Sequence, residues 1–175
     1  PELLFAAVKE LIEEKQIDHT LIKISFYTNS IGQQAFANLA TEYDVQHIVG
    51  VYDYIPKQET LRVMHDSSIL MILTIPYYIS NTYGIIGTKF YEILGIEKPC
   101  LCLNSDEECL AQAIADTNAG LAATNVEEVK AFVLEKYQEW KQNGFTHQQV
   151  VNKEQFTRQH EAAQFEQLFI ETLKH

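Results

Sequence analysis

Two glycines, a threonine, a lysine and a glutamate gather at one predicted strand-to-helix turn of this chain. Gly84 and Gly87 precede a helix that we expect to begin near Thr88. Free backbone N–H groups at such a start, together with the positive end of the helix dipole, attract anions. Lys89 adds a cation, and Glu92, one turn further on, can accept hydrogen bonds from sugar hydroxyls. These residue types favour a ligand that carries both a phosphate group and a polyol, such as a nucleoside diphosphate.

The same spacing has a purely structural interpretation, which the sequence leaves open. The glycines can simply end a loop, and Thr88 can be a helix cap. Lys89 and Glu92, three residues apart, can form a solvated ion pair that contributes about 0.2–0.5 kcal/mol. A glycine-rich strand-to-helix turn is by itself weak evidence for a ligand.

Alternating helical and strand-like patterns must position this turn. Helical spacing of apolar residues is present over 1–15, 33–43, 57–65, 88–94, 107–115, 125–140 and 154–173. Short β-rich runs lie between these segments, at 21–27, 47–52, 68–75, 100–103 and 119–123. This order predicts one α/β domain over residues 1–175, a Rossmann-like, doubly wound parallel sheet of about five strands. Helices would cover both faces, and an extra helix would follow at the C-terminus.

Ligands bind at the carboxyl ends of the strands in such sheets, and the glycine-rich turn follows the third predicted strand. Two local signals refine the helix ends. Gly95 is expected to end the helix over 88–94 as a C′ glycine. Asn125 is expected to cap the next-to-last helix, with Glu128 as its capping-box partner.

Composition narrows the classes of partner. The 175 residues include 13 Lys and Arg against 24 Asp and Glu, a formal charge of -11, which argues against nonspecific binding to nucleic acid or anionic lipid. Three cysteines do not form a secreted disulfide framework and indicate a cytoplasmic setting. We read Cys100 and Cys102, on one strand face, as core residues. No apolar run reaches the roughly 18 residues that span a bilayer. The six histidines lack ligand spacing, so no metal and no cofactor are expected.

The segment 87–101, Gly-Thr-Lys-Phe-Tyr-Glu-Ile-Leu-Gly-Ile-Glu-Lys-Pro-Cys-Leu, resembles a known motif. It is similar to the nucleotide-sugar motif of bacterial glycosyltransferases with the two-domain B fold (family 4 or family 1-like). Segment 50–67, with Asp66 before a strand, and segment 116–121, a turn into the final strand, resemble the same family. The tripeptide at 156–158 resembles the start of its last helix. The similarity covers nearly the whole chain.

The resemblance implies a role for six residues in binding the sugar donor. These are Glu92 for the ribose hydroxyls, Gly87, Thr88 and Lys89 for the diphosphate or the transferred sugar, and Tyr54 and Ile55 for the base. No catalytic residue is assigned. Many retaining members carry a second glutamate eight residues before the ribose glutamate, where this chain has Gly84. The sugar, the base and the stereochemical course therefore stay open.

The resemblance also implies that the chain is the donor-binding part of a longer enzyme. In the family a central strand, a basic loop and an N-terminal acceptor-binding domain come before a helix similar to residues 2–15. We therefore expect either a gap in the sheet, filled by another chain or segment, or a rearranged packing. The intact enzyme would transfer a sugar to an acceptor hydroxyl in cell-surface glycan or polysaccharide synthesis. This part alone is expected to be inactive, and a homo-oligomer through the open sheet or the last helix is left open.

Other classes fit the patterns less well. A non-catalytic receiver-like signalling domain shares the doubly wound fold, but it needs clustered acids at its strand ends. The corresponding positions here are Thr28, Asn29, Thr74 and Pro76. A dinucleotide enzyme needs a Gly-x-Gly-x-x-Gly run, which the sequence lacks. A purely structural or association role stays open, and titration with nucleotides separates it from the donor-binding hypothesis.

Overall fold

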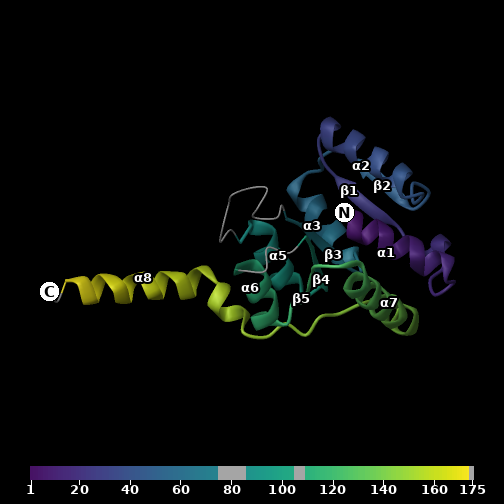
Figure 1. The fold of residues 1–175 in the computed structure, drawn as a ribbon. Helices are drawn as coiled ribbons and strands as arrows, with labels where there is room; N and C mark the ends of the chain where they lie inside the picture. Colours follow the sequence, from purple (N-terminus) through teal and green to yellow (C-terminus); the bar gives the residue numbers. More distant parts are fainter. Residues whose placement is uncertain (75–85, 105–108, 174–175) are drawn as a thin grey trace.

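The computed structural model describes residues 1–74, 86–104 and 109–173, and these form helices that alternate with strands (Figure 1). The α-helices are α1 (Glu2–Glu13), α2 (Ser30–Glu42), α3 (Lys57–Asp66), α5 (Thr88–Ile96), α6 (Cys109–Thr117), α7 (Val126–Asn143) and α8 (Arg158–Thr172). The strands are β1 (Ile24–Tyr27), β2 (Val49–Tyr52), β3 (Leu70–Leu73), β4 (Cys100–Leu103) and β5 (Gly120–Ala123). Two 3₁₀ helices, η1 (His19–Leu21) and η2 (Lys153–Phe156), complete the order. The predicted α/β class is confirmed.

The five strands are parallel, but they form two sheets. β1 pairs with β2 in the register Ile24↔Val49, and the second sheet has the order β3-β4-β5. The expectation of one continuous sheet of about five strands is therefore wrong for the described residues. The physical reason is that β1 and β3 face each other across a cavity instead of hydrogen-bonding, as described below.

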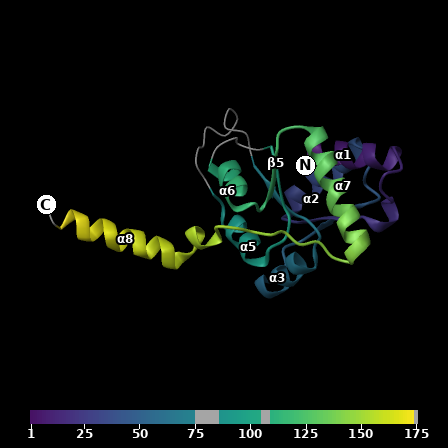
Figure 2. The same ribbon diagram turned by 90° about the horizontal axis from the view of Figure 1, so that it is seen from below.

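The two faces of the strands carry different helices, as the doubly wound prediction requires. Alternate residues of β4 show this directly. Leu101 and Leu103 join a core cluster with buried residues of α1 and α7, whereas Cys100 and Cys102 join a second cluster with α5 and α6. All four side chains are buried, which is typical of a strand covered on both faces. Figure 2 shows α7 lying beside α1, with α3 and α5 on the other side of the strands.

The cysteine prediction is confirmed, because both side chains of β4 point into one packed core. Burial, and to a smaller extent the neighbouring Cys102, raise the pKa of the Cys100 thiol far above its ordinary value. The neutral thiol therefore persists at physiological pH, and Cys100 behaves as a small apolar core residue.

The sequence predicts an N-cap at Asn125 and a helix stop at Gly95, and only the first of these is present in the structure. The Asn125 cap is confirmed: its Oδ1 accepts the Glu128 N–H at 3.0 Å. The Gly95 stop is wrong, since α5 continues to Ile96 and ends at Glu97, which adopts φ 58°. Tertiary bonds fix this end, because the Glu97 carboxylate pairs with Lys153 and its carbonyl accepts the Gln148 N–H at 3.0 Å.

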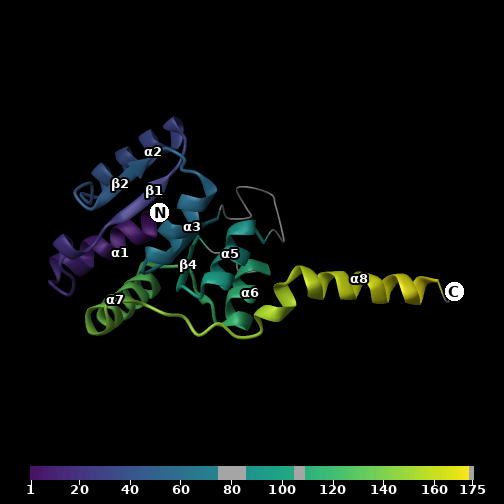
Figure 3. The ribbon, with the colours of Figure 1, turned by 180° about the vertical axis from the view of Figure 1, so that it is seen from behind.

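The polypeptide after α7 runs back across the second sheet before the last helix begins. The buried Thr146 hydroxyl donates to the Ser68 carbonyl at 2.5 Å, and the Val151 N–H donates to the Thr117 carbonyl at 2.8 Å. The predicted last helix is present as α8, preceded by η2. Figures 1 and 3 show α8 projecting away from the body, and none of its residues is buried.

Candidate functional site

The amino end of α5 lies at the carboxyl edge of β3, where the sequence predicts an anion site. Gly87 caps α5 with φ -69° and ψ 154°, and no described side chain hydrogen-bonds to the cap. Within the described ranges, no group accepts a hydrogen bond from the backbone N–H of Thr88 or Lys89. A Cβ atom built on Gly87 would meet nothing within 4 Å. Among the described residues, none therefore closes the start of α5.

Lys89 and Glu92 pair with each other across one turn of α5. The Lys89 Nζ lies 3.1 Å from the Glu92 Oε2. The Lys89 side chain is 58% exposed and that of Glu92 is 31% exposed, so both reach the surface. The purely structural interpretation of the sequence predicts this ion pair. The pair also holds both charged groups near the amino end of α5, where the donor-binding hypothesis expects the ligand.

Tyr54 and Ile55 lie in the loop between β2 and α3 and line the same cavity as Lys89. That cavity, of about 680 Å³, separates β1 from β3. Tyr54 is 68% exposed, and its N–H donates to the Asp53 Oδ1 at 2.7 Å, so the Asp53 carboxylate is engaged in the turn. Three of the six predicted residues therefore line the same cavity, which also extends to the amino ends of the strands at Lys23 and Ser68. Gly87, Thr88 and Glu92 lie beside Lys89 on the first turns of α5 but outside that lining.

A stacked tyrosine pair was not predicted as part of the site. Tyr27 and Tyr52 end β1 and β2 as register partners, and their rings stack with centroids 5.2 Å apart. Tyr27 also lines the cavity. Aromatic faces of this kind can stack on a nucleobase. The sequence shows that both tyrosines end predicted strands. It does not show that these two strands are neighbours, so the stacking of the two rings could not be predicted.

Some predicted residues fall outside the described ranges. These are Gly84, at the position of the second family glutamate, and Pro76, one of the positions compared with the receiver-like class.

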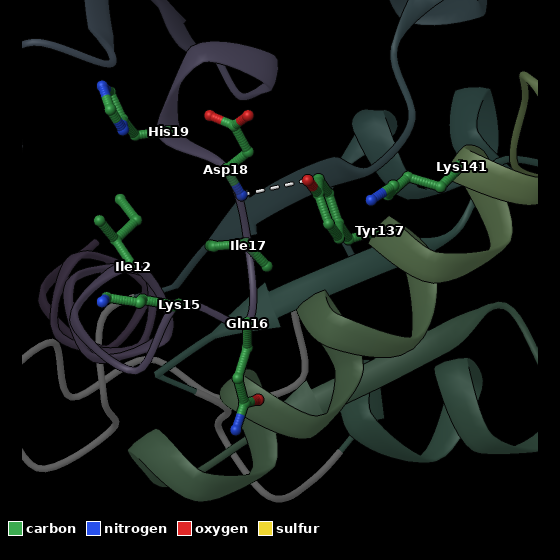
Figure 4. A pocket seen from close by; sticks show the side chains of 8 residues that line it. All are labelled: Ile12, Lys15, Gln16, Ile17, Asp18, His19, Tyr137 and Lys141. Atoms are coloured by element: carbon green, nitrogen blue, oxygen red, sulfur yellow. Dashed lines mark hydrogen bonds between the residues drawn. The ribbon is translucent and has the colours of Figure 1, made fainter.

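A second, smaller pocket of about 340 Å³ lies at the amino end of β1, between the ends of α1 and α7 (Figure 4). The Asp18 N–H donates to the Tyr137 Oη at 3.1 Å. The Asp18 carboxylate accepts from the Thr20 hydroxyl at 2.7 Å and from its N–H at 2.9 Å, and these bonds lower the pKa of Asp18. That carboxylate is therefore engaged in a local turn. The pocket also lies opposite the edge where parallel sheets bind ligands.

The described residues contain no group of three or more His, Cys, Asp or Glu side chains placed to hold a metal ion. No helix in the described ranges is both long and apolar enough to cross a bilayer.

Comparisons with known protein families, with curated proteins and with solved structures found no match to this chain. The described residues form an α/β protein with parallel strands.

Proposed function

We propose that this chain binds the nucleoside diphosphate part of a sugar donor in a glycosyltransferase that transfers a sugar to an acceptor hydroxyl. The observation that carries the proposal is the shared cavity. Lys89, on the first turn of α5, and Tyr54 and Ile55, after β2, line one cavity that runs between β1 and β3. A cation beside free amides suits a diphosphate, and an adjacent apolar and aromatic rim suits a base.

The ion pair defines how the site would respond to its ligand. Lys89 would leave Glu92 and turn to the diphosphate, together with the N–H groups of Thr88 and Lys89. Glu92 would then accept hydrogen bonds from the ribose hydroxyls, which replace its lost partner. As the glycosidic bond breaks, the leaving diphosphate gains negative charge, and donors already aimed at it stabilise that change without reorganising.

The base would lie toward the loop between β2 and α3. Ile55 offers an apolar side chain and Tyr54 an exposed ring, and the stacked pair of Tyr27 and Tyr52 ends the two neighbouring strands. Stacking on an aromatic face is worth about 1–3 kcal/mol per base and accepts any base. The proposal therefore commits to a nucleotide but not to uracil, guanine or adenine.

The resemblance of segment 87–101 to the glycosyltransferase motif supports the same assignment. We place the intact enzyme in the cytoplasm, in the synthesis of surface glycans, with membrane association left open. Transfer needs an acceptor-binding domain besides this chain, so the chain alone is expected to bind nucleotide without transferring sugar. No catalytic residue is proposed.

A second candidate, an association domain of the receiver-like class, is favoured by one observation. The exposed side chains of α8 and its C-cap include Phe165, Leu168, Phe169, Ile170 and the cap residue Leu173. An exposed apolar patch of this kind marks a surface for another protein, such as the acceptor domain or a second copy. Nucleotide binding separates the two candidates, because an association domain has no need of it.

Calorimetric titration with a panel of nucleoside diphosphates tests the proposal. We expect Lys89→Ala to weaken binding by about 10- to 100-fold, the equivalent of one charge-assisted hydrogen bond. Glu92→Ala should weaken it through the ribose. Lys9→Ala is the matched control, because Lys9 also belongs to an exposed helical ion pair, with Glu13 on α1. Equal affinity in all four proteins would overturn the assignment.

A further inference from the structure

The 3₁₀ helix η2 lies against α5, the helix whose amino end carries Gly87, Thr88 and Lys89. The polypeptide after α7 runs past α5 before α8 begins (Figure 2). η2 has four residues, and its first and last residues both contact α5. The first contact lies at the carboxyl end of α5 and the last lies at its first turn. This short segment therefore bears on both ends of the helix.

The carboxyl end of α5 is held by charge and by the main chain. The Lys153 ammonium of η2 pairs with the carboxylate of Glu97, the residue that ends α5. The His147 Nε2 lies 4.0 Å from the same carboxylate, and the Gln148 N–H donates to the Glu97 carbonyl at 3.0 Å. The segment after α7 therefore fixes where α5 ends.

The first turn of α5 is held by an aromatic cluster. Phe156, the last residue of η2, packs edge-on against Phe90, with ring centroids 5.6 Å apart. Its ring also meets that of Tyr91 edge-on, with centroids 6.2 Å apart. Phe90 belongs to the second core cluster, and the half-buried Phe156 packs against that cluster. Edge-to-face pairs have a preferred geometry, so they constrain orientation as well as distance.

Phe90 links this cluster to the amino end of α5. Gly87, Thr88 and Lys89 are exposed, so Phe90 is the first buried residue of the helix. Its N–H donates to the Gly87 carbonyl at 3.0 Å, which closes the first turn. The ion pair of Lys89 joins it to Glu92 of the same helix and does not tie α5 to another element. Packing around Phe90 therefore determines where the preceding N–H groups lie.

We propose that Phe156 is a positioning residue for the anion site at the amino end of α5. It does not touch the ligand. It holds Phe90, and through Phe90 it holds the N–H groups of Thr88 and Lys89 where a diphosphate is expected. A binding site must be held to within about 0.5 Å by the residues that support it, so loss of that support weakens binding without removing a ligand contact. The inference rests on the proposed function and adds to it a residue from a distant part of the chain.

Calorimetry with ADP, GDP and UDP tests this role. Phe156→Ala should weaken the tightest of these ligands by about 5- to 10-fold, measured well below the melting temperature of the variant. Phe156→Leu refills most of the lost volume and should bring the affinity back to within about 2-fold of the parent. Phe132→Ala is the matched control, because Phe132 is also half-buried but packs against the first core cluster. It should lower the melting temperature and leave the affinity unchanged.

Hydrogen exchange measured by NMR tests the same role without a ligand. In Phe156→Ala the protection factor of the Phe90 amide should fall by about 10-fold or more relative to that of the Leu101 amide in β4. Phe132→Ala should leave the ratio of these two protection factors unchanged. A fall confined to the first turn of α5 is expected of a positioning residue and not of general destabilisation.

Two results would overturn the inference. One is an unchanged nucleotide affinity in Phe156→Ala, which together with a lower melting temperature would show that Phe156 only covers the core. The other is an unchanged Phe90 protection factor in that variant. A parent protein that binds none of the three nucleotides overturns the proposed function instead, and the Phe90 amide then decides whether Phe156 places the start of α5.

Discussion

The Nζ of Lys89 lies 3.1 Å from the Oε2 of Glu92, and Lys89 also lines the cavity that Tyr54 and Ile55 share. An ion pair this exposed adds only about 0–1 kcal/mol to the free energy of unfolding. Variants of either residue therefore leave the fold intact. Any change that they cause in ligand affinity can be read as an effect on the site itself.

Gly87→Ala should separate a ligand contact from a structural glycine. A Cβ at this position meets nothing within 4 Å, and the backbone conformation suits any residue, so the free energy of unfolding should stay within about 0.5 kcal/mol of the parent. If a diphosphate approaches this backbone, the added methyl group will weaken its binding. Calorimetry and urea unfolding measure the two quantities.

Gly95→Ala is the matched control on the same helix. Its Cβ also meets nothing within 4 Å, and the residue lies inside α5. Alanine there should raise the free energy of unfolding by about 0.5–1 kcal/mol and leave nucleotide affinity unchanged. Equal affinities of the two glycine variants would show that the ligand does not approach Gly87.

Gly120→Ala should destabilise the second sheet strongly. Gly120 has φ 153°, and a Cβ there would lie 2.0 Å from the Cys100 carbonyl oxygen, inside the pairing of β4 with β5. Relieving that overlap requires the two strands to move apart, so we expect a loss of at least about 2 kcal/mol in urea unfolding. A loss below about 0.5 kcal/mol would contradict the observed register.

Phe5→Ala should cost about 3–5 kcal/mol, because it leaves a cavity in the first core cluster. Phe5 is 0% exposed and packs edge-on against Phe26 and Tyr43, with ring centroids 6.0 Å and 6.2 Å apart. Phe145→Ala, at a residue that is 59% exposed, is the control and should change the unfolding free energy by less than about 1 kcal/mol. Similar losses in both would argue against the packing of α1 on β1.

The attachment of the segment after α7 should weaken in acid. The hydrogen bond from Lys153, and the charge of that residue, lower the pKa of Glu97 from its ordinary value of 4.5. A lowered folded-state pKa means that the contribution of Glu97 is complete above 4.5 and is lost as the pH falls through the folded value. The protection factor of the Gln148 amide, which corrects for the intrinsic pH dependence of exchange, should therefore fall below about pH 4.5 more than global unfolding explains. Glu97→Gln should remove that pH dependence, and an unchanged pH profile in this variant would contradict the role.

Removing residues 158–175 should leave the melting temperature nearly unchanged, because no described residue of α8 is buried. Any self-association of the chain should fall if the apolar side chains of α8 provide the contact. Sedimentation velocity measures this directly. A large drop in melting temperature would show that α8 packs on the body in solution.

Local patterns predicted the elements well. The helical spacing at 1–15 and the apolar run at 100–103 reappear as α1 and β4, and Asn125 caps α7 through its own side chain. These features depend on neighbours within a few residues, so the sequence holds the information. The end of α5 is different, because Glu97 is held by Lys153, far along the chain, and Gly95 therefore did not stop the helix.

The strand patterns alone did not predict the split into two sheets, since pairing between strands depends on contacts distant in sequence, whereas the family resemblance included a gap in the sheet among its expectations. Lys89 and Glu92 are three residues apart, and their pairing follows from helix geometry. The presence of Lys89 and Tyr54 in the lining of one cavity depends on how the strands and helices pack in three dimensions. The stacking of Tyr27 on Tyr52 likewise needed the pairing of β1 with β2.

The most direct test of the donor-binding claim compares ribonucleoside diphosphates with their 2′,3′-dideoxy forms by calorimetry. If Glu92 binds the ribose, the parent protein should prefer the ribose form by about 10-fold or more, and Glu92→Ala should bring that ratio close to about 1. Lys89→Ala should weaken both ligands and keep the ratio. A ratio that survives Glu92→Ala, or a parent protein that binds neither ligand, would contradict the account.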